Sequence, residues 1–150
     1  MQNLRGSLLV ASAKLEDPFF RETVLLITTH TQDGTVGVIV NRPFPDAAKP
    51  LGTPYTLFNG GPLPHQKCMV LHAFDSWAKA PRPDAPEGTF LASPEPVAPG
   101  IYMGDGLDLK RIVESGGKDA NSFRVIRGYA AWAPGQLEAE IEKYGVWHLL

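Results

Sequence analysis

Short apolar runs separated by turn-forming residues organise the first part of the chain. Such runs occupy residues 7–12, 23–29 and 35–40, and each is predicted to form a β-strand. The second run is continuously apolar over residues 24–27, which is typical of a strand covered on both faces. Gly34, between the second and third runs, tolerates a positive φ and favours a tight turn. The pattern therefore predicts a central β-hairpin.

The rest of the chain carries more strand signals than helix signals. Because the strands do not alternate regularly with helices, the pattern favours an α+β fold. We expect a mixed, mainly antiparallel sheet with a barrel-like core and a few short helices packed around it. No internal repeat or change in composition divides residues 1–150, so a single domain is expected. The additional strands are predicted at residues 55–58, 67–74, 89–92, 101–103 and 123–132.

Two helices are predicted in the C-terminal part of the chain. The first covers residues 108–115, and Asp105 or Asp108 can cap the exposed N–H groups at its start. Gly116 follows its last apolar position and is expected to end it. The second helix is expected to begin near Pro134, because proline is tolerated in the first turn of a helix.

Composition and charge narrow the class of protein. The net charge of −2 gives no overall attraction to phosphate backbones, so nucleic-acid binding is not expected. Cys68 is the only cysteine, which excludes an intramolecular disulfide and a cysteine-rich metal site. No stretch approaches the ~20 apolar residues that a membrane-spanning helix needs, and the apolar run near the N-terminus is too short for a signal peptide. We therefore expect a cytoplasmic protein without membrane contact.

Five groups of short motifs follow one another in order along the chain. They are Leu15-Glu16-Asp17-Pro18-Phe19-Phe20 with residues 23–26, Asp33-Gly34 with residues 36–43, Gly60-Gly61-Pro62, Val70-Leu71-His72, and residues 128–138 with Glu140-Ile141. Taken together, this series resembles the AlgH-like (YqgE/AlgH) family of bacterial proteins. The resemblance implies a cytoplasmic protein whose fold is a mixed sheet with a small barrel-like core and surrounding helices. It implies a proposed role in transcriptional regulation. It does not imply any particular reaction, cofactor or set of catalytic residues.

The chain also departs from the family pattern. Ala131 and Ala133 stand where glycines are usual, and the segment at residues 43–57 is shorter than the helical insert that the resemblance implies. The chain ends at Leu150, where relatives are expected to continue with another strand or helix. We therefore expect a C-terminus that is short relative to the family.

Five residues are the candidates for contact with a ligand or partner. Asn41 and Arg42 end a predicted strand, and their side chains could bind a carboxylate or phosphate, or could instead cap strand ends. Gly60 and Gly61 could present backbone N–H groups to an anion, or could form a structural turn. His72 is grouped with them because its motif belongs to the same series.

A thiol-based site and a metal site are both disfavoured. Cys68 and His72 would lie about 13 Å apart on one strand, beyond hydrogen-bond reach, so a buried and inert cysteine is expected. His65 and Cys68 would fall on opposite faces of that strand, which disfavours a shared metal ion. We expect no metal site and no cofactor, and the sequence identifies no catalytic residue.

Three functions remain open at this stage. The leading hypothesis is a non-enzymatic binding or regulatory module, whose partner is an unidentified protein or small ligand. The alternative is an uncharacterised enzyme or small-ligand binder with a pocket near Asn41, Arg42, Gly60, Gly61 and His72. The third is a transcriptional regulator that binds DNA directly, which the sequence pI of about 6.1 and the lack of a helix-turn-helix pattern oppose.

Overall fold

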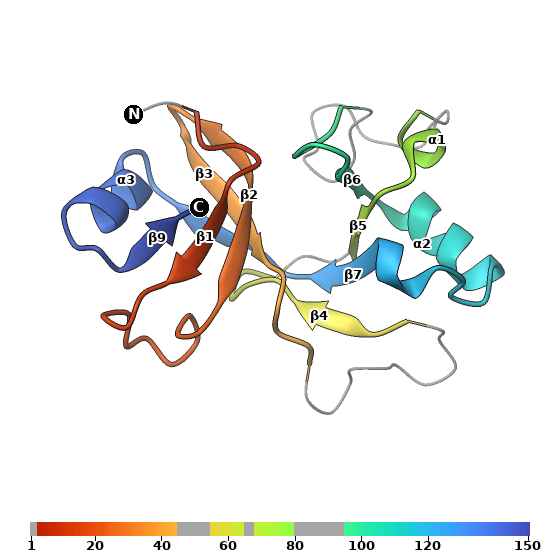
Figure 1. The fold of residues 1–150 in the computed structure, drawn as a ribbon, viewed down its shortest axis with the longest axis horizontal. Helices are drawn as coiled ribbons and strands as arrows, with labels where there is room; N and C mark the ends of the chain where they lie inside the picture. Colours follow the sequence, from red (N-terminus) through yellow and green to blue (C-terminus); the bar gives the residue numbers. More distant parts are fainter. Residues whose placement is uncertain (1–2, 45–54, 65–67, 80–94) are drawn as a thin grey trace.

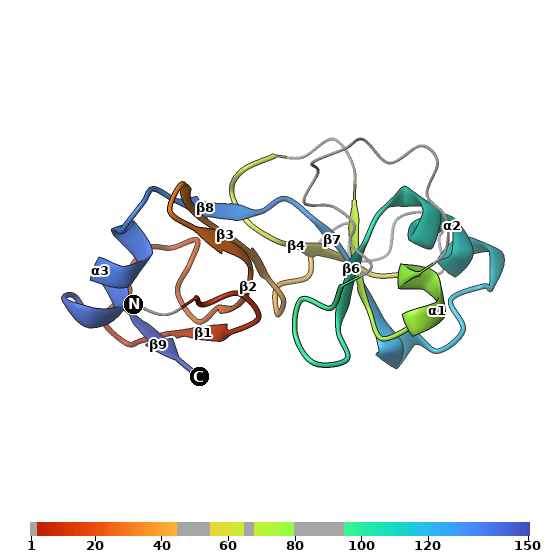
Figure 2. The same ribbon diagram turned by 90° about the horizontal axis from the view of Figure 1, so that it is seen from above.

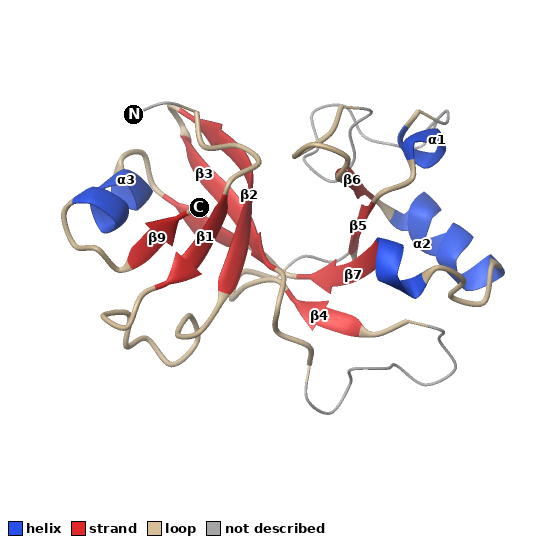
Figure 3. Ribbon diagram, in the orientation of Figure 1, coloured by secondary structure: helices blue, strands red, loops and turns tan. Residues whose placement is uncertain are grey.

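Two β-sheets and their flanking helices make up the described part of the chain. The computed structural model describes residues 3–44, 55–64, 68–79 and 95–150. The strands are β1 (Leu8–Ala11), β2 (Val24–Thr31), β3 (Gly34–Ile39), β4 (Leu57–Asn59), β5 (Met69–His72), β6 (Tyr102–Gly104), β7 (Phe123–Arg127), β8 (Ala130–Trp132) and β9 (Trp147–Leu149). The helices are α1 (Asp75–Ala78), α2 (Gly106–Glu114), the 3-10 helix η1 (Ala120–Ser122) and α3 (Gln136–Glu142). The sheets form two lobes that diverge from a common junction (Figures 1 and 3).

The first sheet contains five strands in the order β8-β3-β2-β1-β9, and all neighbouring strands are antiparallel. β2 and β3 form the predicted central hairpin. Helix α3 lies beside this sheet (Figure 1), and its Leu137 is completely buried in an apolar cluster. The buried members of the cluster are Leu4, Leu9, Leu25, Ile27, Ile39, Ala130, Trp132, Leu137 and Trp147.

The second sheet contains four strands in the order β4-β7-β5-β6. β4 runs parallel to β7, whereas β5 pairs with β7 and β6 in antiparallel fashion. Helix α2 packs beside β5 and buries Ile112 against Leu57, Val70 and Val125. The helix begins at a capping box, because Asp105 and Asp108 each accept a hydrogen bond from backbone at its first turn.

A third apolar cluster joins the two sheets. Leu26 and Val38 come from the first sheet, and the remaining strand residues come from the second. The buried members are Leu26, Val38, Met69, Leu71, Val97, Met103 and Ile126. The expected α+β fold with mainly antiparallel strands and a few short helices is confirmed. The described strands pack as two open sheets around this cluster and do not close into a barrel.

The chain passes between the sheets at a bend supported by glycines. Gly128 separates β7 from β8 and has a φ of 90°, a left-handed conformation that side chains disfavour. The prediction of one continuous strand over residues 123–132 is therefore wrong, because the bend sends β7 and β8 into different sheets. Gly61 lies against the bend, and a Cβ there would come within 2.1 Å of the Tyr129 carbonyl. Figure 2 shows the blue segment of β7 and β8 crossing from one lobe to the other.

Three short elements are absent from the sequence predictions. They are α1, η1 and β9, each of three or four residues, too short for a periodic pattern to develop. β9 pairs with β1 and forms one edge of the first sheet. The strand expected at residues 89–92 lies outside the described residues. No helix in the described ranges is both long and apolar enough to cross a membrane.

Candidate functional site

A cleft of about 760 Å³ lies between the two sheets. β2 contributes to one wall, and β5 and β7 contribute to the other. Figure 1 shows these strands in different lobes. Most of the lining residues are apolar and come from both sheets and from the segment before β6. No aspartate or glutamate is among the lining residues in the described part of the chain. The lining residues with polar side chains are Tyr55, Thr56, His72, Asn121, Ser122 and Arg124.

Arg124 carries the one permanently charged side chain among these lining residues. It projects from β7, and its guanidinium donates a hydrogen bond to the carbonyl of Val40, directly after β3. The guanidinium carbon also lies 4.4 Å from the centre of the Phe58 ring, within the range of a cation–π interaction. Because Val40 follows a strand of the first sheet and Phe58 belongs to the second, Arg124 spans the junction between them.

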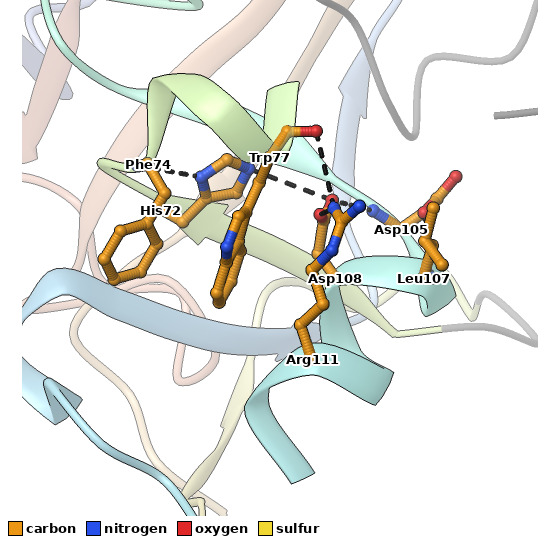
Figure 4. Close-up of polar contacts among 7 residues, drawn as sticks. All are labelled: His72, Phe74, Trp77, Asp105, Leu107, Asp108 and Arg111. Carbon is orange, nitrogen blue, oxygen red and sulfur yellow. Dashed lines mark hydrogen bonds and ion pairs between the residues drawn. The ribbon is translucent and has the colours of Figure 1, made fainter. Parts of the chain in front are cut away.

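His72 lies at the end of β5 and is 2% exposed. Its Nδ1 accepts a hydrogen bond of 3.1 Å from the Phe74 N–H. Its Nε2 faces helix α2 and lies 3.8 Å from Oδ2 of Asp108 (Figure 4). Both ring nitrogens are thus directed at protein groups, although one side of the residue lines the cleft.

Asp108 connects the start of α2 to this strand, and its side chain is completely buried. Its Oδ2 accepts a hydrogen bond of 3.2 Å from the Asp105 N–H, which completes the capping box. Its Oδ1 accepts a charge-assisted hydrogen bond of 2.9 Å from Arg111. Gly104 makes room for the carboxylate, since a Cβ there would lie 1.9 Å from Oδ2. Figure 4 shows the carboxylate between the imidazole and the guanidinium.

Aromatic rings surround His72 on the side of α1. Phe74 and Tyr102 stack on the imidazole, and the Trp77 ring centre lies 5.3 Å from it. The Tyr102 hydroxyl donates a hydrogen bond of 2.7 Å to the exposed Asp75 carboxylate. This bond, followed by the contact with Lys79, lowers the pKa of Asp75, and the same bond raises the pKa of Tyr102.

Asn41 and Arg42 hold the loop that precedes β2. The Asn41 side chain accepts a hydrogen bond of 2.9 Å from the Val24 N–H and donates one of 3.1 Å to the Glu22 carbonyl. The Arg42 guanidinium donates to the carbonyls of Phe19 and Arg21. Neither residue lines the cleft in the described part of the chain, so their role in binding stays a prediction.

Gly60 and Gly61 lie at the junction of the sheets. The Gly60 carbonyl accepts from the Ile39 N–H at 2.8 Å, and its N–H donates to the Arg127 carbonyl at 2.9 Å. The Gly61 N–H donates to the Asn59 side chain at 3.2 Å. The glycines lie near Arg42, because the Asn59 N–H next to Gly60 donates to the Arg42 carbonyl at 2.8 Å. Of the five candidates, His72 alone lines the cleft.

Cys68 lies immediately before β5 and is partly buried. Burial raises the pKa of its thiol, and the positive charge of Arg127 offsets part of this effect. A raised pKa leaves the sulfur protonated near neutral pH and lowers its reactivity as a nucleophile. The thiol in turn contributes to the raised pKa of Tyr55, for which burial is the larger cause.

Sequence reasoning missed Arg124 and Asp108 as residues of this region. Arg124 falls within the strand predicted at residues 123–132, and no local pattern indicates that it reaches Val40, which is 84 residues away in sequence. Asp108 carried a recognisable capping signal, but its contact with His72 depends on where α2 lies relative to β5. The local sequence around Asp108 indicates only a helix cap followed by apolar positions, and it does not indicate the contact with His72.

Comparisons with known proteins agree with the fold. The AlgH-like family model matches residues 8–150. A UPF0301 protein from Chlorobaculum tepidum is 35% identical over 155 residues, which cover 95% of this chain and 72% of the relative. A UPF0301 protein from Streptomyces coelicolor is 32% identical over 159 residues, covering 100% of this chain and 76% of the relative.

Two solved structures share the architecture. The solution structure of the AlgH protein from Pseudomonas aeruginosa has a TM-score of 0.65 and 24% sequence identity, and the match covers 99% of this chain and 77% of that one. A crystal structure of a Corynebacterium diphtheriae protein has a TM-score of 0.67 and 26% identity, covering 99% and 75% of the two chains. The family match over residues 8–150, together with the two UPF0301 relatives, shows that the chain belongs to the AlgH-like family.

Proposed function

We propose that this protein is a non-enzymatic binding module whose cleft between the two sheets holds a small ligand. The observation that carries the proposal is the cleft itself. Its volume of about 760 Å³ falls within the range of roughly 300–1,000 Å³ that is usual for ligand pockets. Its walls are mainly apolar, and a few polar groups are placed among them, which is the usual composition of such a site.

The environment of His72 supports binding rather than catalysis. A general base needs a nitrogen within hydrogen-bond reach of the substrate. In this protein Nδ1 accepts from the Phe74 N–H, and Nε2 is directed at Asp108 on α2. The imidazole therefore supports the packing of α2 against β5, and its side chain has no exposed surface from which to reach a substrate.

A regulatory role fits the same cleft. A ligand in it would touch Val40, next to the first sheet, and Arg124 of the second. A ligand shifts a conformational equilibrium only by its difference in affinity for the two states. Occupancy would thus favour the arrangement of the sheets in which both walls reach the ligand, and a partner protein could distinguish that arrangement.

The test is a thermal-shift screen of the protein against metabolites, nucleotides and short duplex DNA. A ligand at 100 times its Kd stabilises the fold by about 2.7 kcal/mol, which raises the melting temperature measurably. The matched variants are Ala73→Trp, which fills the cleft from an exposed lining position, and Ala131→Trp, which adds the same ring to an exposed position of β8 outside the cleft.

We expect a small molecule to stabilise the unaltered protein and the Ala131→Trp variant but not the Ala73→Trp variant. Equal stabilisation of both variants would place the ligand elsewhere. Stabilisation by DNA alone would favour direct transcriptional regulation and contradict the proposal. A screen without any stabilising compound would count against a small ligand and in favour of a protein partner.

A further inference from the structure

We infer that the ligand of this cleft is a small organic anion, with an apolar body and one carboxylate, sulfonate or phosphate group that binds Arg124. The inference rests on the proposed function, because it specifies the chemistry of the ligand for the same cleft. It is carried by the distribution of charge along the walls and by the geometry of the guanidinium.

The charge of the lining selects against cations. Arg124 is positively charged, and no acidic side chain is among the lining residues that the structure describes. The two carboxylates near His72 lie away from the cleft lining, since Asp108 is completely buried under α2 and Asp75 is bonded to Tyr102 and Lys79. Among the described lining residues, a bound anion would therefore meet one favourable charge and no acidic side chain.

The guanidinium has donors available for such a group. Arginine has five N–H donors in one plane, and the Val40 carbonyl accepts from one nitrogen of Arg124. Phe58 supports the guanidinium carbon at 4.4 Å, which restricts its position without using a donor. A carboxylate or phosphate can then approach in the plane of the guanidinium and accept two parallel hydrogen bonds.

Polar neighbours extend the anion-binding end of the cleft. Asn121 and Ser122 immediately precede β7 and line the cleft beside Arg124. Their side chains carry amide and hydroxyl donors that suit the remaining oxygens of an anion. The apolar body has its own wall, because Leu8 and Leu26 of the first sheet and Leu71 of the second also line the cleft.

A matched pair of fluorescent probes tests the inference. Anilinonaphthalene sulfonate carries a flat apolar body with one sulfonate, and phenylnaphthylamine has the same body without the charge. Their dissociation constants are measured by fluorescence titration of the whole protein, with the Ala73→Trp variant to localise each probe. We expect the sulfonate to bind the unaltered protein at least about tenfold more tightly than the neutral probe, since charge-assisted hydrogen bonds are worth that much.

Variants of Arg124 give a second, independent measurement. Arg124→Gln should weaken binding of the sulfonate by about tenfold and leave the neutral probe within about twofold. Arg127→Gln is the matched control, because Arg127 is also exposed on β7 but does not line the cleft. It should leave both affinities unchanged. Arg124→Lys retains the charge without the planar fork and should give an intermediate loss for the sulfonate.

The outcomes separate this inference from the proposed function. Equal affinity of the two probes, or equal loss of both in Arg124→Gln, would overturn the inference while leaving an apolar binding cleft in place. Binding of neither probe at the cleft would contradict the proposed function itself. The melting temperature of the Arg124→Gln variant shows whether the substitution loosens the junction between the sheets. If it does, the comparison of the two probes on the unaltered protein still decides the inference.

Discussion

The two halves of this molecule bury different kinds of polar side chain. The first sheet packs with α3 around an apolar cluster, and the buried polar side chains of this half are neutral hydroxyls, those of Ser12, Thr23, Thr28 and Thr35. Glu140 meets the core at its edge. There the carboxylate accepts hydrogen bonds from the indole N–H groups of Trp132 and Trp147, at 3.3 and 3.0 Å. The second sheet buries a histidine and an aspartate, His72 and Asp108, beside the cleft. Stability therefore rests mainly on apolar packing in the first half, the apolar half, and partly on a buried ionisable pair in the second, the polar half.

This difference shows which half is suited to change. A core of apolar and hydroxyl side chains loses stability when a side chain is removed, but its fully buried groups do not titrate in the usual pH range. The ionisable contact of this half lies at the edge of the core, where His30 Nε2 is 3.6 Å from Oε1 of the partly exposed Glu138. A buried polar cluster is retained only if its members stay paired, so it responds to changes in its neighbours. The half with the buried polar pair also contributes Arg124 and most of the polar lining of the cleft.

The largest expected effect is in the apolar half. Trp147→Ala removes a side chain that is 2% exposed and deprives Glu140 of a donor, so we expect a loss of about 3–5 kcal/mol in the free energy of unfolding. Urea denaturation measures it. Trp147→Phe keeps most of the apolar volume and should lose clearly less. A loss below about 1 kcal/mol for the alanine variant would mean that β9 contributes little to the core.

An intermediate effect is expected in the polar half. Asp108→Ala removes the partner of Arg111 and one acceptor of the capping box, so the free energy of unfolding should fall by about 2–3 kcal/mol. Asp105→Ala is the control, because it removes a capping interaction but leaves the buried carboxylate in place, and it should lose about 1 kcal/mol. Equal losses in the two variants would show that Asp108 acts only as a cap.

The smallest effect is the contribution of the Cys68 thiol to the pH dependence of the free energy of unfolding. Because its folded pKa is raised, the folded state keeps the proton at a pH where the unfolded chain has lost it. This contribution to stability is fully present below the unfolded pKa of about 8.5 and is lost as the pH rises through the higher folded pKa. Alkylation by iodoacetamide at pH values near 8.5 should be slower for the folded protein than for the chain in urea.

Cys68→Ala supplies the control for that experiment. It should remove this part of the pH dependence of unfolding and leave the rest of the curve intact. A folded thiol that reacts as fast as the unfolded one would contradict the raised pKa. It would also contradict the protection of this sulfur at the edge of the apolar cluster of Leu57, Val70, Ile112 and Val125.

Local sequence patterns predicted individual strands and helices better than they predicted which of these elements lie side by side. The hairpin of β2 and β3 and the helix α2 were both predicted, because their apolar positions repeat over enough residues to be recognised. The strand at residues 123–132 was predicted as one element, since nothing in its apolar pattern reveals that Gly128 adopts a φ of 90°. Of the candidate site residues, only His72 lines the cleft, because a family motif does not indicate which surface its residues face.

By itself, the sequence determined the class of fold, the family, the central hairpin and the start of α2, all of which depend on short-range pattern or on ordered motifs. The tertiary structure alone decided that β7 and β8 enter different sheets, that Asp108 reaches His72, and that Arg124 reaches Val40. The physical reason is that periodicity reports how one segment is buried, whereas a site between sheets depends on the path of the chain. Here that path is determined by the close packing of Gly60 and Gly61 against the bend at Gly128.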